Sequence, residues 1–316
     1  MDDKKNGGFL VRGILQATFL IACLGMVGAT HSPKVLCEGF APKNNLNIPV
    51  TGFADGGITL EQWTALFDKF EKIYSPIIAA RGGTLQLNRL WEDGTVNANA
   101  SQDGTTWTIN MYGGLARYAT ATAAMTVDGM ALVVCHETGH HLGGAPKIGG
   151  DATFWASNEG AADYFGVLKC MRNMFAADDN TSIVSQMSVE PTIQKACGAQ
   201  FQDAKDQAIC MRTATAGILL GHILGELGQE AVPSVDTPDQ SAVTETNDEH
   251  PAAQCRLDTY FQGANCKADV AVAQVGTDYH VGTCTAPTFK MGLRPTCWFK
   301  PDDADSKLEV QHLTTK

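Results

Sequence analysis

The chain has 316 residues, of which 44% are hydrophobic and only 18% are charged. This composition supplies enough apolar side chains for a globular core and excludes a disordered protein. The formal net charge of −11 argues against nucleic acid as a partner.

Residues 1–29 begin with two lysines and an arginine and continue into the apolar run GILQATFLIACLGMVGA. A charged start, an apolar middle and small residues at the end are typical of a secretory signal peptide. Cleavage after Ala29 is one interpretation, and a bacterial lipobox that makes Cys23 the lipidated first residue is another. An uncleaved anchor is the third, although the run is shorter than the ~20 residues that cross a bilayer. The segment predicts an extracytoplasmic protein, periplasmic or secreted.

The chain contains ten cysteines, nine of them after Cys23, and this number suits an oxidising compartment. Nine is odd, so one thiol is left over or pairs between chains. Cys284 and Cys297 lie in a turn-rich tail and are expected to pair. Cys255 and Cys266 are not expected to pair with each other, because a helix between them would hold them too far apart.

The first predicted elements are a helix and two strands. Thr59-Leu60-Glu61-Gln62 matches a capping box and opens a helix whose apolar residues recur at every third and fourth position. Leu85–Trp91 and Thr106–Tyr112 are predicted strands, and apolar residues alternate with polar ones in the second. That strand is well placed to be a sheet edge to which an extended peptide adds, and an ordinary interior strand is the alternative.

The segment Val127–Gly144 reads VDGMALVVCHETGHHLGG and contains an HExxH motif on an apolar helix. His136 and His140 project from one face of that helix and can bind one zinc ion. Glu137 lies beside that face, where a carboxylate can take a proton from a water on the metal. Cys135 points away from the zinc, and is either a partner for another helix or the spare thiol.

A catalytic zinc site needs a third protein ligand and an open position. The longer motif HExxHxxGxxH is incomplete, because its third histidine position is Pro146. The next predicted helix, Ser157 to Met174, carries Glu159 and Asp163 on one face. Glu159 can reach the zinc, and Asp163 can accept the outer N–H of a ligating histidine. A solvated acidic face is the alternative for these two carboxylates.

Asp203 to Glu230 is predicted to be another helix, in which His222 is a core or helix-face residue and not a ligand. After residue 29 no segment is expected to be long and apolar enough to cross a membrane. The best stretch, Ala216–Leu224, contains His222 and is followed by a glutamate.

Residues 231–249 are rich in Pro, Ser, Thr and Asp and are predicted to form a surface loop. This loop brings His250 to the start of a new helix, with Pro251 in the first turn. Capping and a structural ion pair with a carboxylate are the simplest roles for His250 and Arg256.

Three motifs together resemble the gluzincin zinc metallopeptidases: HExxH, EGAAD at 159–163 and HPxxxxR at 250–256. The last two are most similar to the CAAX prenyl protease family and its bacterial membrane and periplasmic relatives. The resemblance covers roughly Leu60 to Tyr260. Two features depart from the family. Only eighteen residues separate His140 from Glu159. In the segment NANA at 97–100, Asn99 stands at a position where the family often has a bulky apolar residue.

The resemblance implies one zinc ion as cofactor and Glu137 as the general base. The ligands that it implies are His136, His140 and Glu159. It further implies that His250 stabilises the tetrahedral oxyanion or occupies the open metal position at rest. The resemblance also implies that Arg256 borders the zinc cleft, where it can orient Glu159 or Asp163.

The sequence therefore predicts an α+β fold that is mainly helical, with a gluzincin-like domain (30–266), a small sheet beside the HExxH helix and a cysteine-containing extension (267–316). The expected function is that of an exported zinc-dependent endopeptidase that acts on a protein or peptide substrate. A catalytically silent, zinc-stabilised protein that binds proteins of the cell envelope is the alternative. A prenyl-protein protease is disfavoured by the missing membrane helices. Membrane attachment would involve only the N-terminal segment, and no oligomeric state is predicted.

Overall fold

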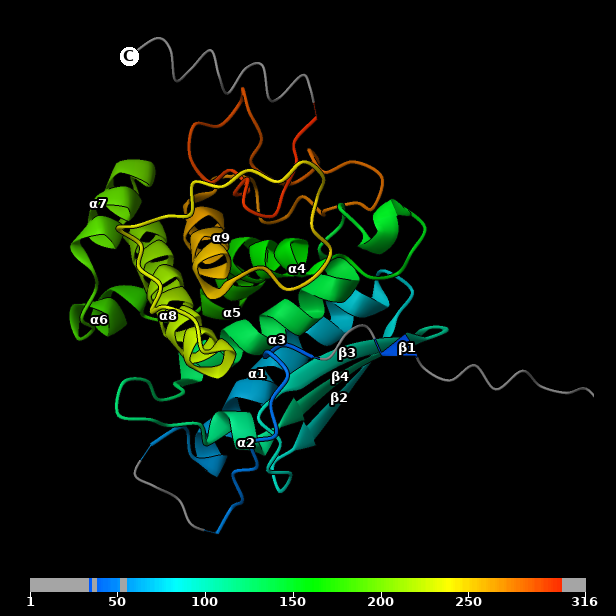
Figure 1. Cartoon of the computed structure of the whole chain (residues 1–316), viewed down its shortest axis with the longest axis vertical. Helices are drawn as coiled ribbons and strands as arrows, with labels where there is room; N and C mark the ends of the chain where they lie inside the picture. The colour runs from blue at the N-terminus through cyan, green and yellow to red at the C-terminus, as the bar shows by residue number, and fades with distance from the viewer. Residues whose placement is uncertain (1–33, 36–38, 52–55, 303–316) are drawn as a thin grey trace, which may run out of the picture. The chain divides into compact units, whose positions relative to one another are not determined.

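The computed structural model describes residues 34–35, 39–51 and 56–302, all within one compact unit that spans Pro33–Lys316. The predicted signal segment, with Cys23, lies outside the described residues, as does Cys37. The described chain is mainly helical and contains one four-stranded sheet, as the sequence predicts (Figure 1).

The sheet has the strand order β1-β3-β4-β2. Its strands are β1 (Lys34–Val35), β2 (Thr84–Leu90), β3 (Ala98–Asp103) and β4 (Thr106–Tyr112). β4 pairs antiparallel with β3 and parallel with β2, so it is an interior strand. The prediction that this strand forms a peptide-binding edge is therefore wrong, and the interior alternative holds.

The two faces of the sheet differ in polarity because apolar and polar residues alternate along β4. Ile109 and Met111 are 0% exposed and belong to the core. On the opposite face Asn110 accepts a hydrogen bond from Asn88 (2.7 Å) and donates one to Asn99 (2.8 Å). Asn99 thus belongs to a polar ladder across three strands, which explains an asparagine at this position.

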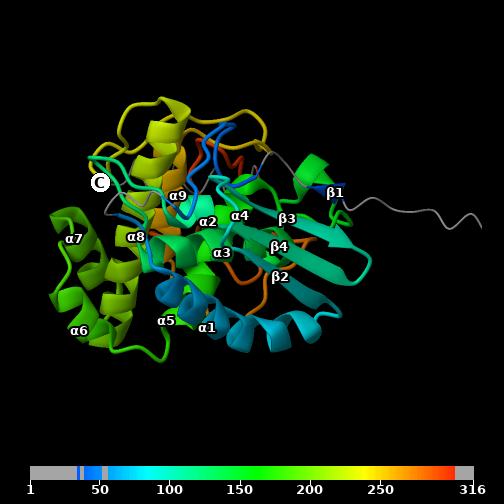
Figure 2. The same ribbon diagram turned by 90° about the horizontal axis from the view of Figure 1, so that it is seen from below.

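Two long helices pack on the sheet, α1 (Leu60–Ala79) against β2 and α3 (Val127–Leu142) against β3 and β4 (Figures 1 and 2). The predicted capping box at Thr59 opens α1, and the Thr126 side chain caps α3. The buried side chains between these layers include Trp63, Phe67, Phe70, Leu132 and Val133. The HExxH helix therefore lies between the sheet and the remaining helices.

The other helices cover the far side of α3. The predicted helix 157–174 is a nearly continuous run of α4 (Glu159–Phe165), the π-helical turn η2 (Gly166–Cys170) and α5 (Met171–Phe175). α8 (Ala204–Gly228) agrees with the prediction and is capped by Asp203. Four short elements connect these: α2 (Gly113–Ala116), η1 (Ile148–Gly150), α6 (Asn180–Ser185) and α7 (Pro191–Gln200).

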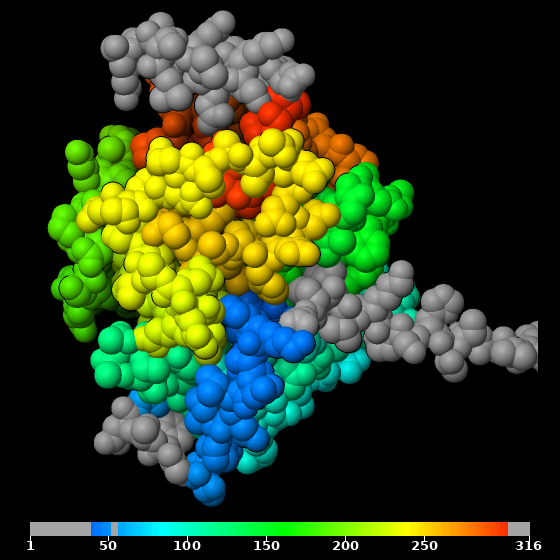
Figure 3. Space-filling view, viewed as in Figure 1, coloured from blue at the N-terminus to red at the C-terminus, as the bar shows by residue number. Residues whose placement is uncertain are grey.

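The last helix, α9 (Ala253–Asn265), begins later than the sequence predicts. Ala252 has an extended backbone with ψ 153°, so Pro251 precedes the helix and His250 lies in the loop. In Figure 3 this loop, in yellow, lies against the tail in red. Two backbone hydrogen bonds join them, from Val243 N to Thr296 O (2.9 Å) and from Asn247 N to Trp298 O (2.8 Å).

The expectation that no later helix could cross a membrane needs one correction. In the part of the chain that the structure describes, α8 alone is long and apolar enough for a span. Its most apolar 18-residue window is 72% buried inside the fold. A core helix passes the same test of length and composition, and α8 packs along α9 as a core helix does.

Four disulfides cross-link the described chain. Their cysteines pair as Cys135–Cys170, Cys197–Cys210, Cys255–Cys297 and Cys266–Cys284. Cys135 joins α3 to η2, which fits its predicted role as a partner for another helix. The predicted pair Cys284–Cys297 is wrong, because the tail does not close on itself but is attached to both ends of α9.

Replacing both Cys135 and Cys170 by alanine should lower the free energy of unfolding by about 2–4 kcal/mol, because the bond joins two cysteines 35 positions apart and closes a loop that includes the HExxH motif. Urea denaturation of wild type and the double variant under non-oxidising conditions measures the difference. Peptide mapping without reduction is the control for the pairing. A peptide that links Cys284 to Cys297 would contradict the pairing described above.

Candidate metal centre

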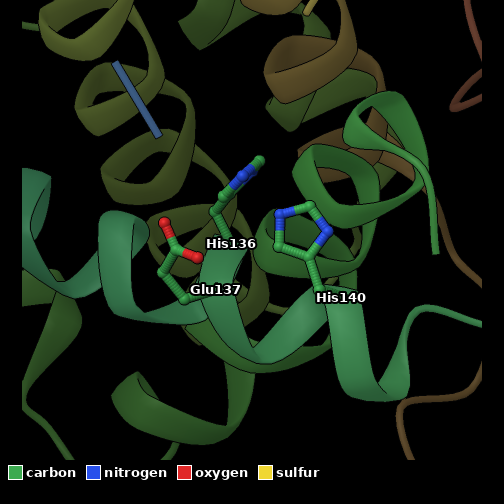
Figure 4. A group of neighbouring side chains, drawn as sticks. All are labelled: His136, Glu137 and His140. Atoms are coloured by element: carbon green, nitrogen blue, oxygen red, sulfur yellow. The ribbon is translucent and has the colours of Figure 1, made fainter. Parts of the chain in front are cut away.

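The HExxH motif forms a compact group of metal-binding side chains on α3. His136, Glu137 and His140 are 0–1% exposed and offer ligand atoms that lie within 4.8 Å of one another. Figure 4 shows the three side chains rising from the same side of the helix. The spacing of four residues puts the two histidines on one face, since a helix turns once in 3.6 residues, and Glu137 lies beside that face. This group could hold a metal ion.

Hydrogen bonds of the two Nδ1 atoms fix the orientation of the His136 and His140 rings. His136 Nδ1 donates to Asp163 Oδ1 (2.6 Å), and His140 Nδ1 donates to the carbonyl of Ser157 (3.0 Å). Because a carboxylate and a carbonyl only accept, each Nδ1 carries a hydrogen, so the neutral form of each ring has its lone pair on Nε2, the atom that can bind a metal. His136 Nε2 is buried and forms no hydrogen bond, as is typical of a metal ligand before the ion binds.

α4 brings the carboxylate of Glu159 to these two nitrogens. Glu159 Oε2 lies 3.2 Å from His136 Nε2, and Glu159 Oε1 lies 3.8 Å from His140 Nε2. α4 can come this close because Gly139 has no side chain; a Cβ atom there would lie 2.6 Å from the carbonyl oxygen of Ala162. The solvated-face alternative is excluded, since Glu159 and Asp163 are 1% and 0% exposed.

Asp163 lies behind His136 and is the acceptor for several donors. Arg256 donates to both of its oxygens, from Nε and from Nη2, at 2.8 Å each, and Tyr260 donates its hydroxyl hydrogen to Oδ1 at 2.9 Å. Arg256 thus forms a buried ion pair with Asp163 and not with Glu159. Tyr260 was not predicted, although its position one helical turn after Arg256 puts both on the same face.

Phe40 is a second residue that the sequence motifs do not identify. Its carbonyl accepts a hydrogen bond from Arg256 Nη1 (2.8 Å), and its ring lies edge-on to the His136 ring with centroids 5.1 Å apart. The same ring lies 4.6 Å from the Arg256 guanidinium carbon. Phe40 therefore covers both groups and shields their charge from solvent.

His250 reaches the centre from the loop before α9. Its Nε2 lies 3.1 Å from Glu159 Oε2, and its side chain is 24% exposed. Asn158 anchors this loop, because its amide donates to Asn247 O (3.0 Å) and to Asp248 Oδ1 (3.2 Å) while its own oxygen caps α4. The imidazoles of His136, His140 and His250 therefore lie around the carboxylate of Glu159.

Burial and charge shift the pKa values of these groups in different directions. Burial raises the pKa of Glu137 to about 8 and lowers that of His140 to about 4. Burial alone would lower the pKa of His136, but the charge of Asp163, the hydrogen bond to Asp163 and the charge of Glu159 raise it to about 9 while no metal ion is bound. Burial alone would raise the pKa of Asp163, but the charges of Arg256 and His136 lower it to about 2.

Other histidines and a second cluster do not join the centre. His141 is 7% exposed and its ring stacks on Trp107, with centroids 5.0 Å apart, so it is a packing residue. A second group of metal-binding atom types combines Asp239 with Cys255 and Cys297. Both sulfurs of that group are joined in a disulfide, which removes them as metal ligands.

The distances between the candidate ligand atoms indicate whether a tetrahedral metal ion fits among them. Two ligand atoms at ~2.0–2.1 Å from a zinc-sized ion lie about 3.3 Å apart when the geometry is tetrahedral. The distance from Glu159 Oε2 to His136 Nε2 (3.2 Å) is close to that value, and the distance from Glu159 Oε1 to His140 Nε2 (3.8 Å) is longer. The residues present therefore fit a small divalent metal ion.

Comparison with known proteins adds no relative: no protein-family model, curated protein or solved structure matches this chain.

Replacing Asp163 by asparagine should lower the affinity for a divalent metal ion about 10–100-fold, because the acceptor that orients His136 is weakened. Competition between the protein and a chelator, with Co²⁺ as the spectroscopic probe, measures the affinity. Asp258→Asn is the matched control, since Asp258 lies on α9 and bonds Asp239 N and Gln254, away from the ligands. Equal affinity of Asp163→Asn and wild type would contradict the role of Asp163.

Proposed function

We propose that this chain is an exported zinc-dependent endopeptidase of the gluzincin type, acting on protein or peptide substrates. The observation that carries the proposal is the convergence of His136 Nε2 and His140 Nε2 on the Glu159 carboxylate, with Glu137 beside them. Four disulfides favour an oxidising compartment outside the cytoplasm.

Zinc is the metal that this set of ligands favours. Two imidazole nitrogens and one carboxylate, with each imidazole held by a hydrogen bond on its other nitrogen, are the donor set of catalytic zinc sites. Softer metals prefer sulfur ligands, and the sulfur next to the motif, Cys135, is bonded to Cys170.

His136, His140 and Glu159 would hold a zinc ion, which would supply Lewis-acid chemistry for the substrate carbonyl and for an attacking water. Glu137 takes the proton of that water and returns it to the leaving amine. In this proposal His250 donates a hydrogen bond to the developing oxyanion, and Asp163, which Arg256 holds by an ion pair, orients His136.

Replacing Glu137 by glutamine should leave zinc binding intact and slow peptide hydrolysis about 10²–10⁴-fold, the usual contribution of a general base. Zinc content by elemental analysis and cleavage of casein measure the two effects separately. Glu226→Gln is the control, since Glu226 bonds only threonines and a tyrosine in the 118–122 segment. Wild-type protein that carries one zinc per chain and cleaves nothing, with or without reductant, would refute the proposal.

A catalytically silent binding protein is the second candidate, and one observation favours it. His250 Nε2 is as close to Glu159 Oε2 (3.1 Å) as the ligand His136 is (3.2 Å), so His250 could be a permanent fourth ligand. A structural zinc site has four closed protein ligands and no open position for water.

Replacing His250 by alanine separates the two candidates. In the peptidase, zinc content stays at one per chain and kcat falls about 10²–10³-fold, because only the oxyanion loses a donor. In the binding protein, zinc affinity falls and the protein loses stability to heat. Zinc titration with calorimetry, together with casein cleavage, distinguishes these results, and His280→Ala is the control for an exposed histidine.

A further inference from the structure

A cavity of about 270 Å³ lies apart from the proposed zinc ligands, and none of its lining residues is one of them. Its walls come from α1, the end of α3, the α4–η2–α5 run and the segment 270–274. The apolar lining residues are Ile77, Leu142, Phe165, Val270, Ala271, Val272 and Ala273.

Lys169 provides a cation in this cavity. It is 3% exposed, and its ammonium donates to the backbone carbonyl of Asp269. Within the described part of the chain the ammonium has no carboxylate partner at salt-bridge distance, and burial lowers its pKa to about 8. A buried ammonium that is bonded to one carbonyl has two further N–H donors, and the Asp269 carboxylate offsets its charge only from beyond salt-bridge distance.

Gln274 provides a second polar group. It is 6% exposed, and neither its amide oxygen nor its amide nitrogen has a hydrogen-bond partner among the described residues. Most buried amides are satisfied, so an unsatisfied donor and acceptor that line a cavity indicate a missing partner.

The segment that carries Gln274 is held in position. Ala145 N donates to Val275 O (2.8 Å), which attaches the segment to the end of α3, and the Cys266–Cys284 disulfide brackets it. Asp269 O also accepts from Val272 N (3.2 Å), so the carbonyl that binds Lys169 closes a turn. The cavity is therefore part of the packed fold.

We propose that this cavity binds a small carboxylate that has an apolar side chain and a neighbouring N–H donor, as in an N-acylated apolar amino acid. The carboxylate accepts from the Lys169 ammonium and the Gln274 amide nitrogen, and the ligand N–H donates to the Gln274 amide oxygen. The apolar walls receive the side chain. This site is independent of the proposed zinc chemistry.

Calorimetric titration of the folded chain with N-acetyl-leucine tests the proposal, with the uncharged N-acetyl-leucinamide as the matched ligand. We expect N-acetyl-leucine to bind with saturation and the amide to bind at least tenfold more weakly, because a hydrogen bond to a charged group is lost. Lys169→Met should weaken binding of N-acetyl-leucine by a similar factor. Lys147→Met is the matched control, since Lys147 is also buried and bonded to a carbonyl, that of Trp155, but does not line this cavity.

A second variant keeps the test decisive if Lys169→Met does not fold. Ala273→Leu fills the half-buried wall of the cavity and leaves Lys169 in place, so it should also abolish binding. Absence of binding to wild type at millimolar ligand would overturn the proposal. So would equal binding of the acid and the amide, or binding that survives Lys169→Met or Ala273→Leu, because the ligand would then be held elsewhere, for example on the metal.

Discussion

The buried ion pair between Asp163 and Arg256 connects more of this molecule than any other polar contact described here. It joins α4 to α9, and Arg256 extends it to the backbone of Phe40 while Asp163 extends it to His136. Removing one partner of such a pair leaves the other charge buried, at a cost of about 3–5 kcal/mol. The carboxylate that stabilises the fold is also the one that orients an imidazole of the candidate metal centre, so the stability of the fold and the geometry of that centre are coupled through Asp163.

Much of the candidate site could be predicted because helical periodicity decides which residues share a face. His136 with His140, and Glu159 with Asp163, each lie four residues apart, so local sequence placed each pair on one side of its helix. The partner of Arg256 was left open between two carboxylates, since only the packing of α9 decides it. Phe40 could not be predicted at all: it contacts Arg256 across 216 positions, and no pattern marks it.

The fold, too, could be predicted only where the local sequence decides it. Alternation in Thr106–Tyr112 predicts a strand with one apolar face, and β4 has these bounds. Whether it lies inside the sheet or at an edge depends on the remote segments β2 and β3, so that choice could not be made from the strand itself. Proximity in sequence likewise suggested Cys284–Cys297, whereas the tail runs along α9 and pairs each cysteine with a different end of that helix.

Gly139 has a consequence for which substitutions this chain tolerates. Its missing side chain lets the backbone of α4 come against α3, and any larger residue there would push α4 away and carry Glu159 with it. The distance between that carboxylate and the imidazoles would change although no ligand had been replaced. Substitutions at position 139, which has no ligand atom, should therefore disturb the candidate metal centre as readily as substitutions of the histidines beside it. The atoms of Ala162 that a new side chain would meet are backbone atoms, so a smaller residue at position 162 would not relieve the contact.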